Sequence, residues 1–158
     1  MGARLGVLGV LGVLGLLGVA GLAGCGETGK PPSAAATVEQ LKGQGLPIRK
    51  VETYTEENDP NKLLGRPGQY VGKANFRDRR AEDDGLDGLD VSEGGSVEVF
   101  ESEGDAEERE NYVKAIGETG GPFAEYAYRR GRVLLRVAGD LTPTQAREYE
   151  AALEKVAP

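Results

Sequence analysis

The pattern of apolar and polar positions is clearest near the C-terminus, where it predicts an amphipathic helix. Thr142 stands at the N-cap position, Pro143 at the first helical position and Gln145 at the third. This is the arrangement of a capping box with proline at N1. The residues that follow place apolar side chains at helical spacing and predict one buried face: Ala146, Tyr149, Leu153 and Val156.

Residues 94–137 predict a strand, a helix and a hairpin in that order. Ser96–Glu101 alternates after a glycine pair, which is typical of a strand. Asp105 with Glu108 indicates a helix start, and one face continues at helical spacing until Gly117: Ala106, Arg109, Tyr112, Val113 and Ile116. The segments 124–129 and 132–137 then alternate around Arg130-Gly131, which predicts a two-residue hairpin turn.

The pattern before residue 94 is weaker but of the same kind. Thr37 with Gln40 indicates a short helix, and residues 48–54 and 70–77 favour strands. Strands joined by hairpins and interspersed with helices are typical of the α+β class. We therefore expect residues 37–158 to form a single two-layer α+β domain, mainly an antiparallel sheet of about five strands backed by helices.

The N-terminal segment has a different pattern. Arg4 precedes an apolar run from Leu5 to Ala23 in which glycine recurs every third position from Gly6 to Gly21. A single basic residue before such a run is typical of a secretory signal peptide, which we predict for residues 1–24. A transmembrane helix is the alternative because the run almost spans a hydrocarbon core, but six glycines weaken a spanning helix.

The apolar run ends in Leu22-Ala23-Gly24-Cys25, which contains the only cysteine of the chain. This stretch resembles the lipobox of bacterial lipoproteins. The resemblance implies cleavage before Cys25 and a diacylglycerol thioether on its thiol, with an N-acyl chain as an option. Two acyl chains are what stable membrane anchoring requires. The expected location is the extracytoplasmic face of the cell membrane, with the lipid anchor as the membrane contact.

Residues 26–36 contain glycine, proline, alanine and serine but no large apolar side chain. Such a segment cannot bury enough apolar surface to fold by itself. We therefore expect residues 25–36 to form a lipidated cysteine followed by a flexible tether.

Composition excludes several chemistries. The chain has a formal net charge of −7, no histidine and a single cysteine. An acidic surface repels phosphates, so we expect no nucleic-acid partner. Intramolecular disulfides and Cys/His zinc sites are excluded. A hydroxyl nucleophile would lack histidine as its base, and no phosphate-binding glycine loop follows a strand. We expect a protein that is not an enzyme and that carries no cofactor besides the lipid.

The stretch from Asn58 to Tyr70 is the most unusual part of the domain. Asp59-Pro60 suits the start of a short helix that Gly65 would end in a left-handed conformation. The polar residues of this loop form a candidate recognition patch: Asp59, Asn61, Arg66, Gln69 and Tyr70. The favoured interpretation is that they satisfy one another and the loop backbone while Leu63 and Leu64 fill the core, and a recognition patch is the second interpretation.

A second candidate is the acidic segment between residues 83 and 90. Its carboxylates are oxygen ligands of the kind that calcium prefers: Asp83, Asp84, Asp87 and Asp90. Their spacing does not match an EF-hand loop. A solvated acidic loop, neutralised by the neighbouring arginines, is the favoured interpretation, and a metal site is the alternative.

Several stretches together resemble a group of small Gram-positive extracellular lipoproteins: DPNKLLGRPGQY, the following KANF, GGSVEVFES and RGRVLLRVAGDLTP. The resemblance covers most of the chain from residue 52 onward and implies a lipid-anchored outer-surface protein. The expected function is a non-catalytic binding or accessory module at the cell surface, with a cell-wall or membrane-protein partner. A calcium-responsive module that uses residues 83–90 is the alternative.

Overall fold

The sheet of this protein is antiparallel and has the strand order β1-β2-β3-β5-β4. The computed structural model describes residues 2, 29–82, 88–120 and 124–157. Within these ranges five strands form the sheet: β1 Ile48–Thr53, β2 Gly72–Asp78, β3 Gly94–Val99, β4 Glu125–Arg130 and β5 Val133–Ala138. The predicted α+β fold with about five antiparallel strands is confirmed. The strands β1 and β4 are the two edges, and the register of β1 shifts between Ile48 and Val51.

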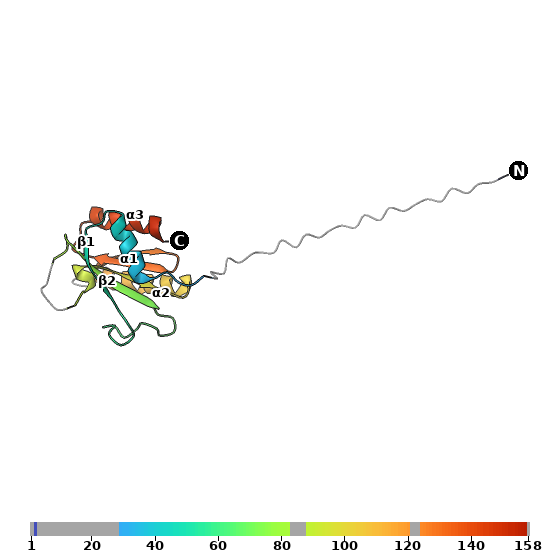
Figure 1. Cartoon of the computed structure of the whole chain (residues 1–158), viewed down its shortest axis with the longest axis horizontal. Coiled ribbons are helices and arrows are strands. Elements are labelled where there is room, and N and C mark those ends of the chain that lie inside the picture. The colour runs from blue at the N-terminus through green and yellow to red at the C-terminus, as the bar shows by residue number, and fades with distance from the viewer. Residues whose placement is uncertain (1, 3–28, 83–87, 121–123, 158) are drawn as a thin grey trace.

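Three helices pack on the two faces of this sheet: α1 Ala34–Gly43, α2 Glu103–Glu118 and α3 Pro143–Val156. Figure 1 shows α1 and α3 together on one side. The second helix packs on the opposite face, mainly against β4 and β5. The single helical layer that the sequence predicted is therefore formed by α1 and α3. The helix α2 adds a partial third layer on the opposite face of the sheet. A single 3₁₀ turn, η1 Val91–Glu93, precedes β3.

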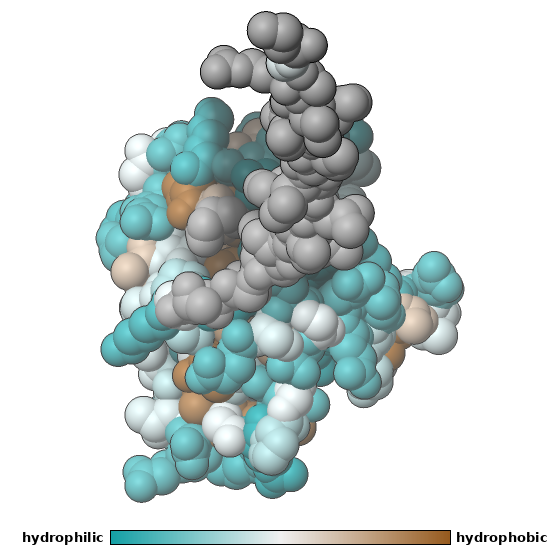
Figure 2. Space-filling view, turned by 90° about the vertical axis from the view of Figure 1, so that its right-hand side faces the viewer, coloured by the Kyte–Doolittle hydropathy of each residue, from teal (hydrophilic) through white to brown (hydrophobic). Residues whose placement is uncertain are grey.

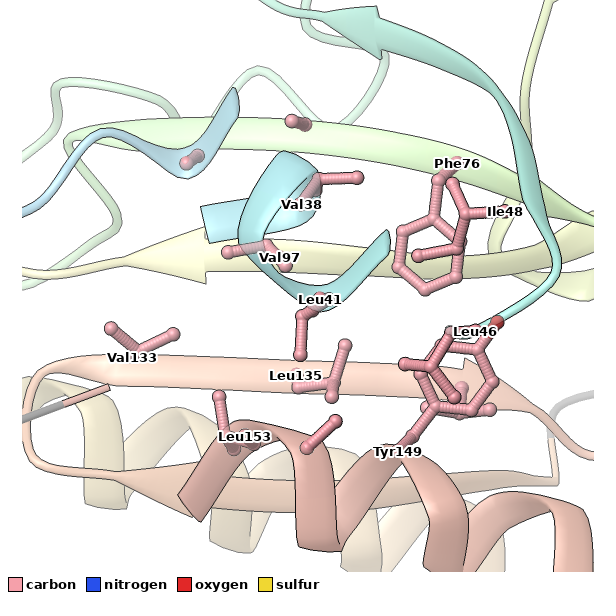
Figure 3. Packing of buried hydrophobic residues seen from close by; sticks show 14 of the residues in the cluster. Val38, Leu41, Leu46, Ile48, Phe76, Val97, Val133, Leu135, Tyr149 and Leu153 are labelled. Atoms are coloured by element: carbon pink, nitrogen blue, oxygen red, sulfur yellow. The ribbon is translucent and has the colours of Figure 1, made fainter. Parts of the chain in front are cut away.

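The main apolar core fills the space between the sheet and the α1/α3 layer. Figure 3 shows side chains from both helices meeting those of the strands. Val38 and Leu41 of α1 are fully buried, and the ring of Tyr149 stacks on Phe76 at a centroid distance of 5.5 Å. Each large apolar side chain buried in this way contributes about 1.5–3 kcal/mol relative to an exposed one. This core holds the two helices on one face and leaves the other face to α2 and to polar groups.

The predicted start of α3 is confirmed in atomic detail. The Thr142 side chain accepts a hydrogen bond from the Gln145 backbone N–H at 3.3 Å, and Gln145 Oε1 accepts from the Thr142 N–H at 2.8 Å. Pro143 occupies the first turn. These contacts satisfy donors that a helix N-terminus otherwise leaves unpaired.

The first helix begins earlier than its apolar pattern predicts. Ser33, not Thr37, is the N-cap residue, and the helix begins at Ala34. The predicted tether of residues 25–36 therefore extends three residues too far, because Ala34 is buried in the core with 4% of its surface exposed. Alanine has high helix propensity but carries no periodic signal, so the pattern alone placed these residues outside the helix.

The loop after β1 forms successive turns instead of the predicted short helix. Lys62 adopts the left-handed region at a φ of 55°, which interrupts a helical path soon after Asp59. Gly65 is left-handed as predicted, with a φ of 79°. The Asp59 carboxylate accepts hydrogen bonds from the backbone N–H groups of Leu63 and Leu64, so it draws the chain around itself in place of a helix.

Two further boundaries differ from prediction by small shifts. Ser102 caps α2 three residues before the predicted Asp105 signal, and Tyr112, which was predicted to face the core, is 57% exposed. The hairpin turn between β4 and β5 is Gly131–Arg132, one residue later than predicted. The hairpin itself is confirmed.

Candidate functional site

A row of polar residues crosses the sheet face opposite α1 and α3. The strand register pairs Glu52 with Asn75, Asn75 with Ser96 and Ser96 with Arg136. Cross-strand partners point to the same face of a sheet. Asn75 is 3% exposed and Ser96 is fully buried. We call Glu52, Asn75, Ser96 and Arg136 the polar row.

A cavity of about 1020 Å³ lies over this row. Glu52, Asn75 and Arg136 of the polar row line it, together with Tyr54, Lys73 and the backbone around η1. The charged residues that line it are mostly acidic: Glu52, Glu82, Asp90, Glu93, Glu125 and Asp140 against Lys73 and Arg136. A concave surface with polar floor and acidic rim is the kind of place where a small polar ligand binds.

Both lining cations already have carboxylate partners. Arg136 donates two hydrogen bonds to Glu125, each at 2.7 Å, and a third to Glu98 Oε1 at 2.9 Å. Glu98 is fully buried and also accepts from Arg109 Nε at 2.9 Å. Burial alone would raise the pKa of Glu98, but Arg136 and Arg109 outweigh it and lower that pKa. The guanidinium of Arg136 is therefore not available to bind an anion.

Lys73 belongs to a group that we call the Asp59 cluster: the buried Asp59, Tyr70 and Lys73 together with the exposed Asn61. Lys73 Nζ donates to Asp59 Oδ1 at 2.9 Å, and the Tyr70 hydroxyl donates to Asp59 Oδ2 at 2.7 Å. Asn61 Nδ2 donates to the Tyr70 oxygen at 3.3 Å. Lys73 Nζ also lies over the Tyr54 ring at 4.8 Å from its centroid.

The electrostatics of the Asp59 cluster keep its carboxylate ionised. Burial alone would raise the pKa of Asp59, but hydrogen bonds from Lys73, from two backbone N–H groups and from Tyr70 hold it well below its usual range. The pKa of Tyr70 is raised by burial and by its hydrogen bond to Asp59. The cluster therefore acts as a fixed ion pair that joins the loop after β1 to strand β2.

Hydrogen-bonding capacity is left over on the floor of the cavity. Asn75 Nδ2 donates to the Leu89 carbonyl at 2.6 Å and to the Tyr54 oxygen at 3.3 Å. Among the described residues, the side-chain oxygen of this amide, Asn75 Oδ1, has no partner. The hydroxyl of Ser96, on the neighbouring strand and outside the cavity lining, has none among them either. Buried polar groups are normally paired, so these two oxygens call for a donor that the described chain does not supply.

The structure brings together only part of the predicted recognition patch. Asp59 and Tyr70 are fully buried, so the prediction that they belong to a surface patch is wrong, and the favoured interpretation of mutual satisfaction describes their contacts. Asn61 joins them through Tyr70. Arg66 is exposed and Gln69 half-buried, and a backbone turn, Gln69 N–H to the Arg66 carbonyl at 3.0 Å, connects these two.

The other predicted sites fall mostly outside the described residues. Cys25, Asp83, Asp84 and Asp87 all lie there. Asp90 is the N-cap of η1, and its Oδ1 accepts from the Ser92 N–H at 3.2 Å. Within the ranges that the structure describes, no group of three or more acidic, His or Cys side chains could hold a metal ion. No helix in the same ranges is long and apolar enough to cross a membrane.

Several residues of the site were missed at the level of sequence. Lys73, Asn75, Ser96, Glu98 and Arg136 occupy the polar positions of alternating strands, and such positions usually face solvent. Lys73 on β2 and Glu98 on β3 are cross-strand partners, whereas Arg136 on β5 is opposite Ser96 and reaches Glu98 diagonally. These opposite charges are a signal in retrospect. That signal becomes readable only when the strand order is known.

The lowered carboxyl pKa values predict how stability depends on pH. Asp78, like Asp59 and Glu98, has a lowered pKa, since Arg80 and Tyr149 outweigh the effect of its burial. A lowered pKa contributes stability above the unfolded value near 4, and this contribution is lost as the pH falls further. We expect a constant melting temperature from pH 7 to 5 and a steep fall below about pH 4 in calorimetry. Asp78→Asn should flatten that fall, and a decline that begins above pH 6 would contradict this explanation.

Comparison with known proteins does not assign this chain to a family. The resemblance to small extracellular lipoproteins stays a prediction based on short stretches of sequence. No protein-family model matches the sequence, and no curated protein or solved structure is significantly similar to the chain.

Proposed function

We propose that this protein is a lipid-anchored, extracytoplasmic, non-catalytic binding module whose cavity receives a cationic ligand. The observation that carries the proposal is the combination of an acidic cavity rim with an unpaired oxygen, Asn75 Oδ1, on its floor. The lipid anchor is proposed from Cys25 and from the signal-peptide-like sequence that precedes it. A cell-wall or membrane-protein partner that presents an amine would fit such a cavity.

The chemistry of the lining supports a ligand that donates hydrogen bonds and carries positive charge. Asn75 Oδ1 can only accept a hydrogen bond, so its partner must be a donor. Glu52 extends the same row and is half-exposed at the cavity. An ammonium group has three donors and a positive charge. Glu93 and Glu125 already pair with Arg77 and Arg136, so the rim charge that attracts an ammonium is that of the other lining carboxylates: Glu52, Glu82, Asp90 and Asp140.

An anionic ligand is disfavoured by the same contacts. Lys73 and Arg136 line the cavity, but Asp59, Glu98 and Glu125 already neutralise them. Catalysis is disfavoured too, because a general acid or base needs a pKa near the working pH. The pKa values of Asp59 and Glu98 are shifted away from that range.

The anchor is tested by Cys25→Ser. The serine hydroxyl cannot form the thioether, so we expect the variant to lose membrane attachment and to retain residues 1–24. Fractionation followed by mass spectrometry measures both properties. Equal amounts of wild-type and variant protein in the membrane fraction would contradict a lipid anchor at this residue.

The ligand class is tested by titrating the purified full-length protein with spermidine in a calorimeter at physiological salt. We expect binding that Glu52→Gln weakens about tenfold, since a hydrogen bond to a charged group contributes about 1.5–3 kcal/mol. Glu154→Gln is the matched control, because this residue is exposed on α3 away from the cavity.

Two further titrations separate the alternatives. The uncharged 1,4-butanediol should produce no heat, and calcium chloride tests the calcium-responsive interpretation of residues 83–90. If spermidine produces no heat at millimolar concentration, or binds both variants equally, a cationic ligand in this cavity is excluded. If calcium alone binds, the alternative function replaces the one proposed.

A further inference from the structure

We propose that the end of the sheet that carries the β4–β5 turn lies directly against the phospholipid headgroups of the membrane. This inference rests on the lipid anchor proposed above. It concerns how the domain is held at the membrane, which the anchor alone does not specify: a long flexible tether would let the domain turn freely. We call this end, with Gly131–Arg132 and the start of α1, the anchor-side end.

The first observation is a contact between the segment before α1 and the hairpin turn. Arg132 Nη1 donates a hydrogen bond to the carbonyl oxygen of Gly29 at 2.8 Å. These residues are 103 positions apart in the chain, and only 9% of the Arg132 surface is exposed. The segment that follows the lipidation site is therefore fastened to the domain at Gly29.

The residues between this contact and α1 are also held. Pro31 and Pro32 are half-buried against the domain, and proline fixes its backbone φ angle. Ser33 caps the helix, since its side-chain oxygen accepts from the Ala36 N–H at 3.4 Å. The predicted tether therefore contacts the domain at Gly29, Pro31 and Pro32, before α1 begins.

Chain length then limits how far the anchor-side end can stand from the bilayer. Four peptide units join Cys25 to Gly29, and a fully extended chain covers at most about 3.3–3.6 Å per residue, or about 14 Å in total. An acylated Cys25 lies at the level of the headgroups. The Arg132 contact therefore cannot leave the headgroup region by more than this reach.

The side chains of this end are suited to headgroups and not to the hydrocarbon core. Lys30 and Arg130 are exposed beside the Gly29 contact. Figure 2 looks onto this end and shows mainly hydrophilic residues among those that it colours by hydropathy. Basic residues next to an anionic leaflet contribute about 1 kcal/mol each. The exposed carboxylates of Glu101 and Glu103 lie at the same end, so the reach of the chain from Cys25, and not net charge, brings this end to the membrane. The partner is the phospholipid headgroup layer, whose phosphates Lys30 and Arg130 contact without insertion of an apolar patch.

The opposite end of the sheet should then face away from the bilayer. Asp140 follows β5 at that end, whereas Glu101 lies beside the turn, since Phe100 N–H donates to the Arg132 carbonyl at 2.9 Å. The strand between them rises about 3.3 Å per residue, so the two positions are about 20 Å apart. A quencher that is confined to the headgroups can distinguish two labelled positions at that separation.

The experiment uses two cysteine variants of the full-length lipidated protein, Glu101→Cys and Asp140→Cys. Each removes one exposed negative charge, and the acylated Cys25 does not react with a thiol-specific fluorophore. The proteins are reconstituted in phosphatidylglycerol–phosphatidylcholine vesicles that contain a headgroup spin-labelled lipid. We expect quenching at position 101 to exceed quenching at position 140 at least threefold.

A third variant tests the hydrogen bond between Arg132 and Gly29. Arg132→Gln in both the Glu101→Cys and the Asp140→Cys backgrounds should reduce the difference in quenching toward that of a freely turning domain. Equal quenching at both positions, or stronger quenching at 140, in protein that floats with the vesicles would overturn this orientation while leaving the anchor intact. Protein that does not float with vesicles at all would overturn the anchor and the orientation together.

Discussion

We expect Asp59→Asn to lower the free energy of unfolding by about 3–5 kcal/mol, as the removal of one partner of a buried ion pair does. The amide leaves Lys73 buried at 3% exposure without its counter-charge. It also replaces one of the two carboxylate oxygens with an amino group, which cannot accept the hydrogen bonds that Asp59 now receives. Urea unfolding followed by circular dichroism measures this loss.

The matched comparison for this prediction is Asn61→Ala. Asn61 belongs to the same cluster but is exposed, and it contacts Tyr70 with a neutral hydrogen bond. Its removal should cost about 0.5–1.5 kcal/mol. The double variant Asp59→Asn with Lys73→Met should recover part of the stability, because it removes the unpaired charge. Equal losses for Asp59→Asn and Asn61→Ala would show that the ion pair does not stabilise the loop.

The second large effect is expected at Glu98, on the central strand β3. Glu98→Gln removes the charge that pairs with both Arg109 and Arg136, at nitrogen–oxygen distances of 2.9 Å each. Because Glu98 is fully buried, we expect a loss of about 3 kcal/mol in the free energy of unfolding. Thermal and urea unfolding of the purified protein check this value.

Glu125→Gln is the control for Glu98. It also removes a carboxylate from Arg136, but Glu125 is 17% exposed and its loss is compensated by water and by Glu98. Pairs nearer to solvent contribute about 0–1 kcal/mol. A Glu125→Gln loss as large as that of Glu98→Gln would mean that burial does not determine the strength of this network.

The parts of the fold that the sequence predicted are those decided by neighbouring residues. The capping box of Thr142 and Gln145 involves residues three apart, and the β4–β5 hairpin joins adjacent segments. Ser33 was missed as the cap of α1 because the residues after it are alanines, which give no apolar period.

The cavity could not be predicted because its residues meet only in the folded sheet. Asn75 and Ser96 lie on strands that pair with each other, yet the sequence between them gives no sign of the pairing register. The Asp59 cluster is similar, since Lys73 follows Asp59 by 14 positions. A polar residue in an alternating strand is read as solvent-facing unless its charged partner is known.

The two edge strands of the sheet, β1 and β4, affect how readily copies of this domain pair with one another. An unpaired strand edge is a template for pairing with a second chain. On β1 the register shifts between Ile48 and Val51, and charged residues such as Arg49 and Lys50 occupy the strand. On β4 the edge ends in Arg129 and Arg130. Bulges and charges of this kind oppose strand-to-strand aggregation, so copies of this domain remain separate molecules at high local concentration.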